Sequence, residues 1–181
     1  MRNLEFKARL KNDDEKDAIR RARSLGAEIW GDLRQTDTYF ATPRGRLKLR
    51  ETAGFEAELI FYERDESSAT RPSDYTRAAV RQAAELAEAL SRALGVVGVV
   101  RKRRTLLLVD VVRIHLDNVE GLGRFLELEV PVTPVSGSEQ DGVPGEAVAA
   151  ATLADLMAGL GYTQDDAIRQ SYLDLLPGNQ K

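Results

Sequence analysis

The sequence predicts an α+β fold in which about eight short strands, mostly antiparallel, close into a barrel with helices packed outside. Most of the predicted strands alternate apolar and charged residues, so each has one apolar face and one charged face. The charged faces carry both signs and are rich in Arg and Lys, whereas open polar faces usually contain more Thr, Ser and Gln. Closing the sheet would turn these charges inward and create a polar tunnel. The alternative is an α+β sandwich whose charged face lies in water.

The composition limits the classes of protein. The chain has 181 residues with 26 basic and 29 acidic side chains, and its net charge of -3 argues against a typical nucleic-acid binder. It has no Cys and one His, His115, which excludes thiolate and multi-histidine metal centres. Any metal would be held by oxygen, which favours Mg²⁺ or Mn²⁺. No apolar run reaches the length of a membrane span and no signal-peptide pattern is present, so we expect a soluble, cytoplasmic protein without a membrane partner.

The first half of the chain predicts alternating strands and one helix. Residues 3–10 alternate strictly, with Asn3, Glu5, Lys7 and Arg9 on one face. A helix should begin after Asp13 or Asp14 and end near Leu25, before Gly26. Further strands are predicted over residues 34–41, 46–50, 56–63 and 74–80.

The strand at residues 46–50 has the sharpest alternation. Arg46, Lys48 and Arg50 share a face, and only an anion or several carboxylates would offset their mutual repulsion. On an open sheet in water this pattern would mean little, whereas inside a closed barrel it would indicate a polyanion site.

The second half predicts a helix over residues 82–94 and two apolar strand halves within 96–112 that flank the basic run 101–104. Alternation sends two of those four cations inward, and the sequence does not decide which pair. A loop at 131–144 precedes a C-terminal segment, residues 145–176, which is predicted to be helical with a break near residues 159–161.

The stretch from Arg113 to Val130 carries the strongest indication of a site. It predicts two strands joined by a Gly-containing loop, with Arg113, His115 and Asp117 on one face of the first strand. Glu127 and Glu129 share a face of the second strand, where they could bind one hard cation or oppose a cluster of positive charge. For His115 we favour a hydrogen-bonded structural role over that of a catalytic base.

These motifs together resemble the CYTH superfamily, which contains class IV adenylyl cyclases, thiamine triphosphatases and inorganic triphosphatases. The N-terminal Asn-Leu-Glu-Phe-Lys is similar to its ExExK signature. The resemblance covers essentially the whole chain and continues, in order, through Asp37–Phe40, Arg46–Arg50, Lys102–Arg104, Arg113–Asp117, Gly121–Gly123, Glu127–Glu129 and Ser171–Tyr172. The pattern Arg-Ile-His-Leu-Asp followed by Gly-Leu-Gly is most similar to chains grouped with the class IV cyclases.

The resemblance implies a single domain over residues 1–181, folded as an eight-stranded antiparallel tunnel that binds a triphosphate and a divalent metal. The implied metal ligands are Glu5, Glu127 and Glu129, with Asp117 as a weaker candidate or a group beside the ligands. The implied phosphate contacts are Lys7, Arg9, Arg46, Lys48, Arg50, Lys102, Arg104 and Arg113. The implied catalytic residues are Lys7, Tyr39 and Arg50.

Two positions depart from the family pattern. Asn3 stands where the signature has its first glutamate, so metal affinity should fall or one of two metals should be lost. Residues 59–62 lack a lysine that many members carry, which argues against a triphosphatase that uses a lysine–tyrosine pair.

Three functions are compatible with these observations. The first is a class IV adenylyl cyclase-like lyase that converts ATP to cyclic AMP and pyrophosphate. The second is a triphosphatase acting on inorganic triphosphate or on an organic one such as thiamine triphosphate. The third is a non-catalytic triphosphate or nucleotide binder. The sequence leaves open the organic part of the substrate, the preferred metal and whether the protein is a homodimer.

Overall fold

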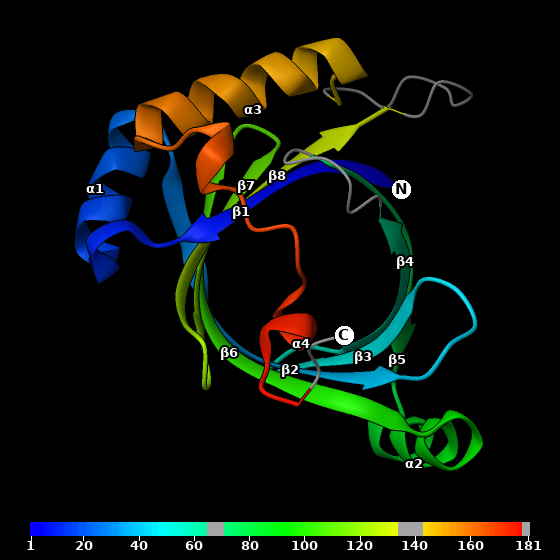
Figure 1. The fold of residues 1–181 in the computed structure, drawn as a ribbon. Helices are drawn as coiled ribbons and strands as arrows, with labels where there is room; N and C mark the ends of the chain where they lie inside the picture. The colour runs from blue at the N-terminus through cyan, green and yellow to red at the C-terminus, as the bar shows by residue number, and fades with distance from the viewer. Residues whose placement is uncertain (65–70, 134–142, 179–181) are drawn as a thin grey trace.

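Eight antiparallel strands form a closed barrel in the structure, a computed structural model that describes residues 1–64, 71–133 and 143–178. Figure 1 looks into this barrel. Around the ring, the strands are β1 (Arg2–Arg9), β5 (Arg71–Val80), β4 (Ala57–Arg64), β3 (Arg46–Thr52), β2 (Glu28–Phe40), β6 (Val96–Val109), β7 (Val112–Val119) and β8 (Gly123–Val132). Because β8 pairs with β1, the sheet has no free edge. The predicted closed barrel is confirmed, and the open sandwich is wrong.

Three helices pack against the outside of the barrel. They are α1 (Glu15–Ser24), α2 (Ala83–Leu94) and α3 (Glu146–Leu160). The predicted cap of α1 is present, since the Asp14 side chain accepts a hydrogen bond from the Asp17 backbone N–H at 3.0 Å. A 3₁₀ turn, η1 (Lys11–Asp13), connects β1 to α1.

The outward faces of the strands supply the hydrophobic cores. Side chains such as Phe6, Ile114 and Leu128 are fully buried between the β1–β8–β7 wall and helices α1 and α3. A smaller cluster, which includes Leu49, lies beneath α2 on the other side of the barrel. The apolar faces of strands such as β1, β3, β7 and β8 therefore pack against helices, and their charged faces line the interior.

Strands β2 and β6 differ most from the sequence prediction. Strand β2 begins at Glu28 because residues 28–33 pair with β6 across an irregularity between Ile29 and Gly31, which breaks the alternation that a sequence pattern requires. Strand β6 is continuous through the basic run because it pairs with β2 on one side and β7 on the other.

The C-terminal segment is less helical than predicted. After α3 ends at Gly161, which has a positive φ of 83°, only a 3₁₀ turn, η2 (Gln164–Asp166), and a short helix, α4 (Tyr172–Leu175), are helical. Between them Ala167 forms a β-bridge with Ala8, and the Ile168 backbone N–H donates to the Lys7 carbonyl at 2.7 Å. Pairing with β1 holds this backbone extended, so the prediction of a helix through residue 176 is wrong.

This segment crosses one end of the barrel, where α4 lies over the opening (Figure 1). A cluster of buried side chains closes that end and includes Tyr39, Phe125, Tyr172 and Leu173. No helix among the described residues is long and apolar enough to cross a membrane.

Candidate functional site: the interior of the barrel

The inward side chains of the eight strands enclose a cavity of about 260 Å³, into which the C-terminal segment adds Ser171 and Tyr172. Six of the cations predicted to bind phosphate line it: Lys7, Lys48, Arg50, Lys102, Arg104 and Arg113. Three predicted metal ligands line the same cavity: Glu5, Glu127 and Glu129. Side-chain exposure rises away from the covered end, from 0% at Asp117 through 16% at Glu127 to 31% at Arg113, so ligands have access from the opposite end.

The strand register arranges the charged residues in two rows across β1, β8 and β7. Glu127 pairs with Lys7 on one side and His115 on the other. Glu129 pairs in the same way with Glu5 and Arg113. Because directly opposed residues in antiparallel strands share a face, each row points its side chains into the cavity.

The basic run on β6 points alternate residues in opposite directions. Lys102 and Arg104 are buried and face the cavity, whereas Arg101 and Arg103 are exposed on the outer surface. There they line a wider groove of about 1000 Å³, where Arg103 binds Glu15 at 2.8 Å. The structure thus decides which pair lies inside, and it is the pair expected to contact phosphate.

Arg104 organises the covered end of the cavity. Its guanidinium donates two hydrogen bonds of 2.6 Å to Asp117 and one of 2.7 Å to Glu127. The Tyr172 hydroxyl and the Lys102 ammonium also contact Asp117, at 3.0 and 3.3 Å. Burial would raise the pKa of Asp117, but the Arg104 and Lys102 cations outweigh it and lower the pKa to about 2. With both carboxylate oxygens bonded in this way, Asp117 serves to hold cations in place.

A second buried carboxylate, Asp37, holds cations on the opposite wall. It accepts two hydrogen bonds of 2.7 Å from Arg50 and one of 3.0 Å from Lys48. Burial favours the neutral acid, yet these two cations keep the pKa of Asp37 well below its usual range. The pKa of Lys48 falls to about 7, because burial and the Arg50 cation together outweigh the attraction of Asp37.

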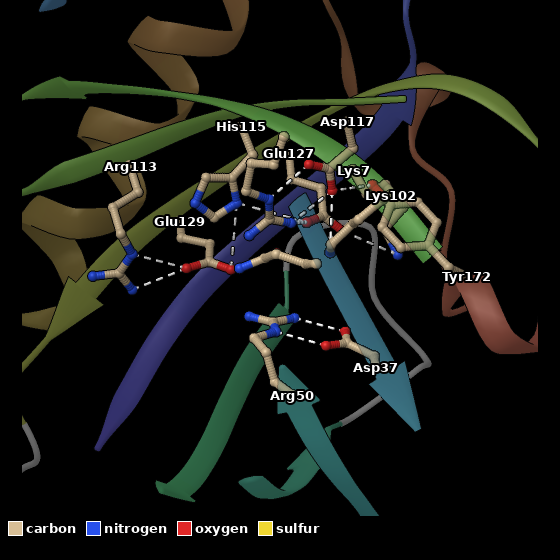
Figure 2. A network of polar contacts seen from close by, with 12 residues as sticks. Lys7, Asp37, Arg50, Lys102, Arg113, His115, Asp117, Glu127, Glu129 and Tyr172 are labelled. Atoms are coloured by element: carbon tan, nitrogen blue, oxygen red, sulfur yellow. Dashed lines mark hydrogen bonds and ion pairs between the residues drawn. The ribbon is translucent and has the colours of Figure 1, made fainter. Parts of the chain in front are cut away.

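Glu127 and Glu129 are the carboxylates that reach the more open part of the cavity. Glu127 lies 3.3 Å from the Lys7 ammonium, and Glu129 accepts a 2.9 Å hydrogen bond from Arg113. The imidazole of His115 lies between them, with Nδ1 3.7 Å from an oxygen of each (Figure 2). Burial lowers the pKa of His115, so the ring is neutral at neutral pH and can act as a ligand.

Of the predicted phosphate contacts, all of which fall within the described chain, Arg9 and Arg46 lie outside the cavity lining. Arg9 is at the exposed end of β1, where its guanidinium stacks on Phe125 at 4.5 Å and donates to the Leu122 carbonyl. Arg46 donates to Asp174 of α4 at 2.6 Å. Both share the face of the phosphate contacts in their strands, but each lies at a strand end, where it binds the β7–β8 turn or α4 instead.

Tyr39 lines the covered end of the cavity and is 4% exposed. Burial, together with the neighbouring Tyr62 and Asp37, raises its pKa well above the ordinary value. Tyr39 therefore remains protonated and can donate a hydrogen bond, but it is a poor base.

The predicted site residues did not include Asp37, Tyr172 or His115, which contact the predicted cations and carboxylates. Asp37 belongs to the matched segment Asp37–Phe40, and its opposition to Arg50 in the β2–β3 pair would have indicated its role. The ring of Tyr172 lies beside Lys7 and Lys102, whose ammonium groups are 4.3 and 5.1 Å from the ring centroid. His115 was interpreted as structural, although it shares a face with Arg113.

The closed antiparallel barrel forms a tunnel lined with charged side chains, and sequence comparison assigns the chain that builds it to a family. The CYTH domain model matches residues 1–142, and the chain belongs to the CYTH family. The predicted family is confirmed.

Relatives and solved structures agree with this membership. A protein of Methanocaldococcus jannaschii named "Putative adenylate cyclase MJ0240" is 34% identical over 76 residues, which span 42% of this chain and 39% of that protein. The PH1012 protein of Pyrococcus horikoshii has a TM-score of 0.80 at 24% identity, with 96% of this chain and 99% of that one covered. A structure described as a putative adenylate cyclase from Vibrio parahaemolyticus has a TM-score of 0.71 at 19% identity, with 96% of each chain covered. These structures share the fold of this chain.

Proposed function

We propose that this protein is a divalent-metal-dependent enzyme that acts on a triphosphate-containing substrate. The most direct form of the proposal is a class IV adenylyl cyclase-like lyase that converts ATP to cyclic AMP and pyrophosphate. The observation that carries it is one cavity lined both by six of the cations predicted to bind phosphate and by the carboxylates of Glu5, Glu127 and Glu129.

The cations are held in place before any substrate binds. Arg104 is fixed by Asp117, and Arg50 and Lys48 are fixed by Asp37, each through charge-assisted hydrogen bonds. Donors that are already oriented need little reorganisation when charge develops on phosphate oxygens, and this arrangement is the main source of catalysis in phosphoryl and nucleotidyl transfer. Arginine forks match phosphate oxygens geometrically, so we assign Arg50 and Arg104 to the phosphate chain.

The carboxylates of Glu127 and Glu129, with Glu5 beside them on β1, are the residues that would hold Mg²⁺ or Mn²⁺. Oxygen donors of this kind suit both cations. A bound divalent cation would supply neutralisation of the phosphate charge. Asp117 takes the role of a group beside the ligands, because its oxygens are bonded to Arg104, Lys102 and Tyr172.

In the cyclase reaction the ribose 3′-oxygen forms a bond to the α-phosphorus, and the bond from that phosphorus to the pyrophosphate oxygen breaks. The 3′-hydroxyl proton leaves with a base or with solvent, and pyrophosphate takes the electron pair of the broken bond. Lys7, Arg50 and Arg104 would stabilise the charge on the transferred group and on the departing pyrophosphate.

One observation supports hydrolysis of an inorganic or organic triphosphate, such as thiamine triphosphate, as the second candidate. Lys48 has a pKa of about 7, and its ammonium lies 5.6 Å from the ring centroids of both Tyr39 and Tyr62. A lysine that is partly neutral near pH 7 can accept a proton from an attacking water. Lys48 would thus replace the lysine that residues 59–62 lack.

A turnover assay with ATP and with inorganic triphosphate, each in Mg²⁺ and in Mn²⁺, tests the proposal. The wild type is compared with the double variant Glu127→Gln/Glu129→Gln, and the products are separated chromatographically. Glu56→Gln/Glu120→Gln is the matched control, because it removes the same charge from the groove outside the barrel.

Cyclic AMP and pyrophosphate that disappear only in the cavity variant would establish the cyclase. Orthophosphate release with the same mutational pattern would assign the protein as a triphosphatase. Tight triphosphate binding without turnover in either metal would leave a non-catalytic binder, and no binding would overturn the proposal.

A further inference from the structure

The imidazole of His115 has an unsatisfied nitrogen that points at two carboxylates. The side chain is 4% exposed, and its Nδ1 is one of three buried side-chain polar atoms in the described residues that lack a hydrogen-bond partner. A buried nitrogen without a hydrogen-bond partner destabilises the folded protein, because it has lost its bonds to water and gained none in return. Such an atom therefore calls for a bonding partner that the protein alone does not supply.

The surrounding atoms form a set of donors that one cation could share. Among the residues that the structure describes, His115, Glu127 and Glu129 are the group of three whose ligand atoms all lie within 4.8 Å of one another. Ligand atoms bound to one cation at about 2.1 Å lie roughly 3.0 to 3.4 Å apart. The 3.7 Å separations from Nδ1 to the two carboxylate oxygens are close to that spacing.

The neighbouring cations leave room for such a ligand set. Arg113 donates to one oxygen of Glu129, Oε2, so Oε1 faces His115 (Figure 2). The Glu127 oxygen nearest to His115, Oε2, also accepts a 2.7 Å hydrogen bond from Arg104 and would be shared between Arg104 and a metal. His115 Nδ1 and Glu129 Oε1 therefore face each other directly, whereas Glu127 Oε2 would bind both Arg104 and the metal.

Asn3 stands where the family signature has a glutamate, so a nitrogen ligand from β7 becomes more important for holding a metal. It is 4% exposed and brings no charge, and its amide oxygen accepts a 3.0 Å hydrogen bond from Arg113 in the orientation that satisfies both of its polar atoms. In that orientation Asn3 binds Arg113. The donor that Asn3 does not supply would then come from β7, the other strand that pairs with β8, where His115 lies across from Glu127.

We propose that His115 Nδ1, Glu127 and Glu129 form a mixed nitrogen–oxygen cation site that selects Mn²⁺ or a later first-row divalent metal over Mg²⁺. The proposal rests on the divalent-metal role proposed for this cavity, and it replaces the all-oxygen site that the sequence predicted. Imidazole suits transition metals, whereas Mg²⁺ prefers oxygen ligands and retained waters. The site should therefore discriminate between the two metals even without substrate.

Mn²⁺ binding to the full-length, chelator-stripped protein tests the site without nucleotide or turnover. Titration followed by electron paramagnetic resonance gives the affinity, and competition with Mg²⁺ gives the selectivity. Pulsed measurements on the bound Mn²⁺ detect nitrogen coupling from a directly bound imidazole. We expect a ¹⁴N coupling and a preference for Mn²⁺ of about tenfold or more.

His115→Phe keeps a ring of similar shape and removes the donor. We expect this variant to lose the ¹⁴N coupling and about tenfold or more of its Mn²⁺ affinity, while Mg²⁺ binding changes little. Arg101→Gln, on the outer face of β6, is the control and should bind both metals as the wild type does. If His115→Phe does not fold, the ¹⁴N measurement on the wild type still decides.

Bound Mn²⁺ without nitrogen coupling, or equal Mn²⁺ affinity in folded His115→Phe, would overturn the mixed site. Those results would leave the proposed function intact if the turnover assay succeeds with an oxygen-bound metal. Conversely, nitrogen-coupled Mn²⁺ in a protein that turns over neither ATP nor inorganic triphosphate would support the metal site and refute the proposed activity on these two substrates.

Discussion

Asp37 and Arg50 face each other across β2 and β3 and are joined inside the barrel by two parallel hydrogen bonds of 2.7 Å. The Asp37 side chain is 2% exposed and Arg50 is 15% exposed, so the pair is largely shielded from water. Asp37 also binds Lys48 at 3.0 Å. The Asp37 carboxylate therefore compensates the charge of two adjacent buried cations, Arg50 and Lys48, in the proposed phosphate site.

Asp37→Asn should destabilise the free protein strongly. Removing one partner of a buried ion pair leaves an uncompensated charge, which typically costs about 3 kcal/mol. The free energy of unfolding, measured by urea denaturation without ligand, should fall by about that amount. Asp155→Asn on the exposed face of α3 is the control. A loss as small as that of the control would contradict the role assigned to Asp37.

The acid limb of the stability curve offers a separate check on Asp37. Its pKa is lower in the folded protein than its ordinary value of 3.8, so the unfolded chain binds a proton more readily. The stabilisation from Asp37 is therefore complete above about pH 4 and decreases as the pH falls below that value. Urea denaturation at a series of pH values should show a shallower acid decline in Asp37→Asn than in the wild type, and parallel curves would refute this assignment.

Lys48 should make triphosphate binding depend on proton uptake. Its pKa is about 7 in the free protein, and the negative charge of a bound triphosphate would raise it. At pH 8 binding should therefore take up a proton, whereas at pH 6 Lys48 is already charged and this uptake should be small. Calorimetry in buffers of different ionisation enthalpy measures the protons exchanged.

The variant Lys48→Met should lose most of the uptake at pH 8, and Lys16→Met on the outer helix α1 should keep it. Equal uptake in the wild type and in Lys48→Met would assign the proton to the ligand or to another group. The same pKa sets the sign for stability: between pH 7 and 10.5 the unfolded chain holds more protons, so the contribution of Lys48 to stability rises with pH.

The barrel could be predicted from the sequence because alternation along its strands places charged residues such as Lys48 and Glu127 inside and apolar residues such as Leu49 and Leu128 outside. The alternation at residues 46–50 and 113–130 survives in β3, β7 and β8 without a break. The start of β2 could not be predicted, since the irregularity at Ile29 and Gly31 shifts the faces of the strand. The path after α3 depends on pairing with Ala8 and Lys7, which lie far away in the sequence.

The site could be predicted in outline for the same reason, but not in its pairings. Lys102 and Arg104 face inward only because the register of β6 with β2 and β7 places them there. Arg46 shares a face with Lys48, yet its guanidinium binds Asp174 of α4 at the end of the strand. A face can be assigned from alternation, whereas a partner on another element requires the folded chain.

Arg46→Gln should make local opening of α4 more frequent and should have little effect on triphosphate binding. Arg46 and Asp174 are 24% and 20% exposed, so their ion pair should contribute about 1 kcal/mol. Amide hydrogen exchange at residues 173–176 should then become about fivefold faster if these residues open locally. Arg44→Gln in the neighbouring exposed turn should leave exchange unchanged.

Triphosphate affinity distinguishes the two roles of Arg46. It should fall much less in Arg46→Gln than in Lys102→Gln, because Arg46 lies outside the cavity lining and Lys102 is part of it. Comparable losses of affinity in the two variants would restore Arg46 to the phosphate contacts that the sequence predicted.

Tyr172 should contribute to the site in two separable ways. Its hydroxyl donates to Asp117 at 3.0 Å, and its ring lies beside the ammonium groups of Lys7 and Lys102 at 4.3 and 5.1 Å. Tyr172→Phe removes only the hydrogen bond to a buried carboxylate and should cost about 1.5 kcal/mol of unfolding free energy. Tyr172→Leu removes the aromatic face as well and leaves both cations less well held.

We therefore expect Tyr172→Phe to retain triphosphate affinity within a few-fold, since Arg104 and Lys102 still hold Asp117. Tyr172→Leu should lose both further stability and affinity, because Lys7 and Lys102 would no longer be positioned by the ring. Urea denaturation and calorimetric titration with inorganic triphosphate measure the two effects. If both variants lost the same stability and the same affinity, the ring would have no role in positioning these cations, and the C-terminal segment would only cover the end of the barrel.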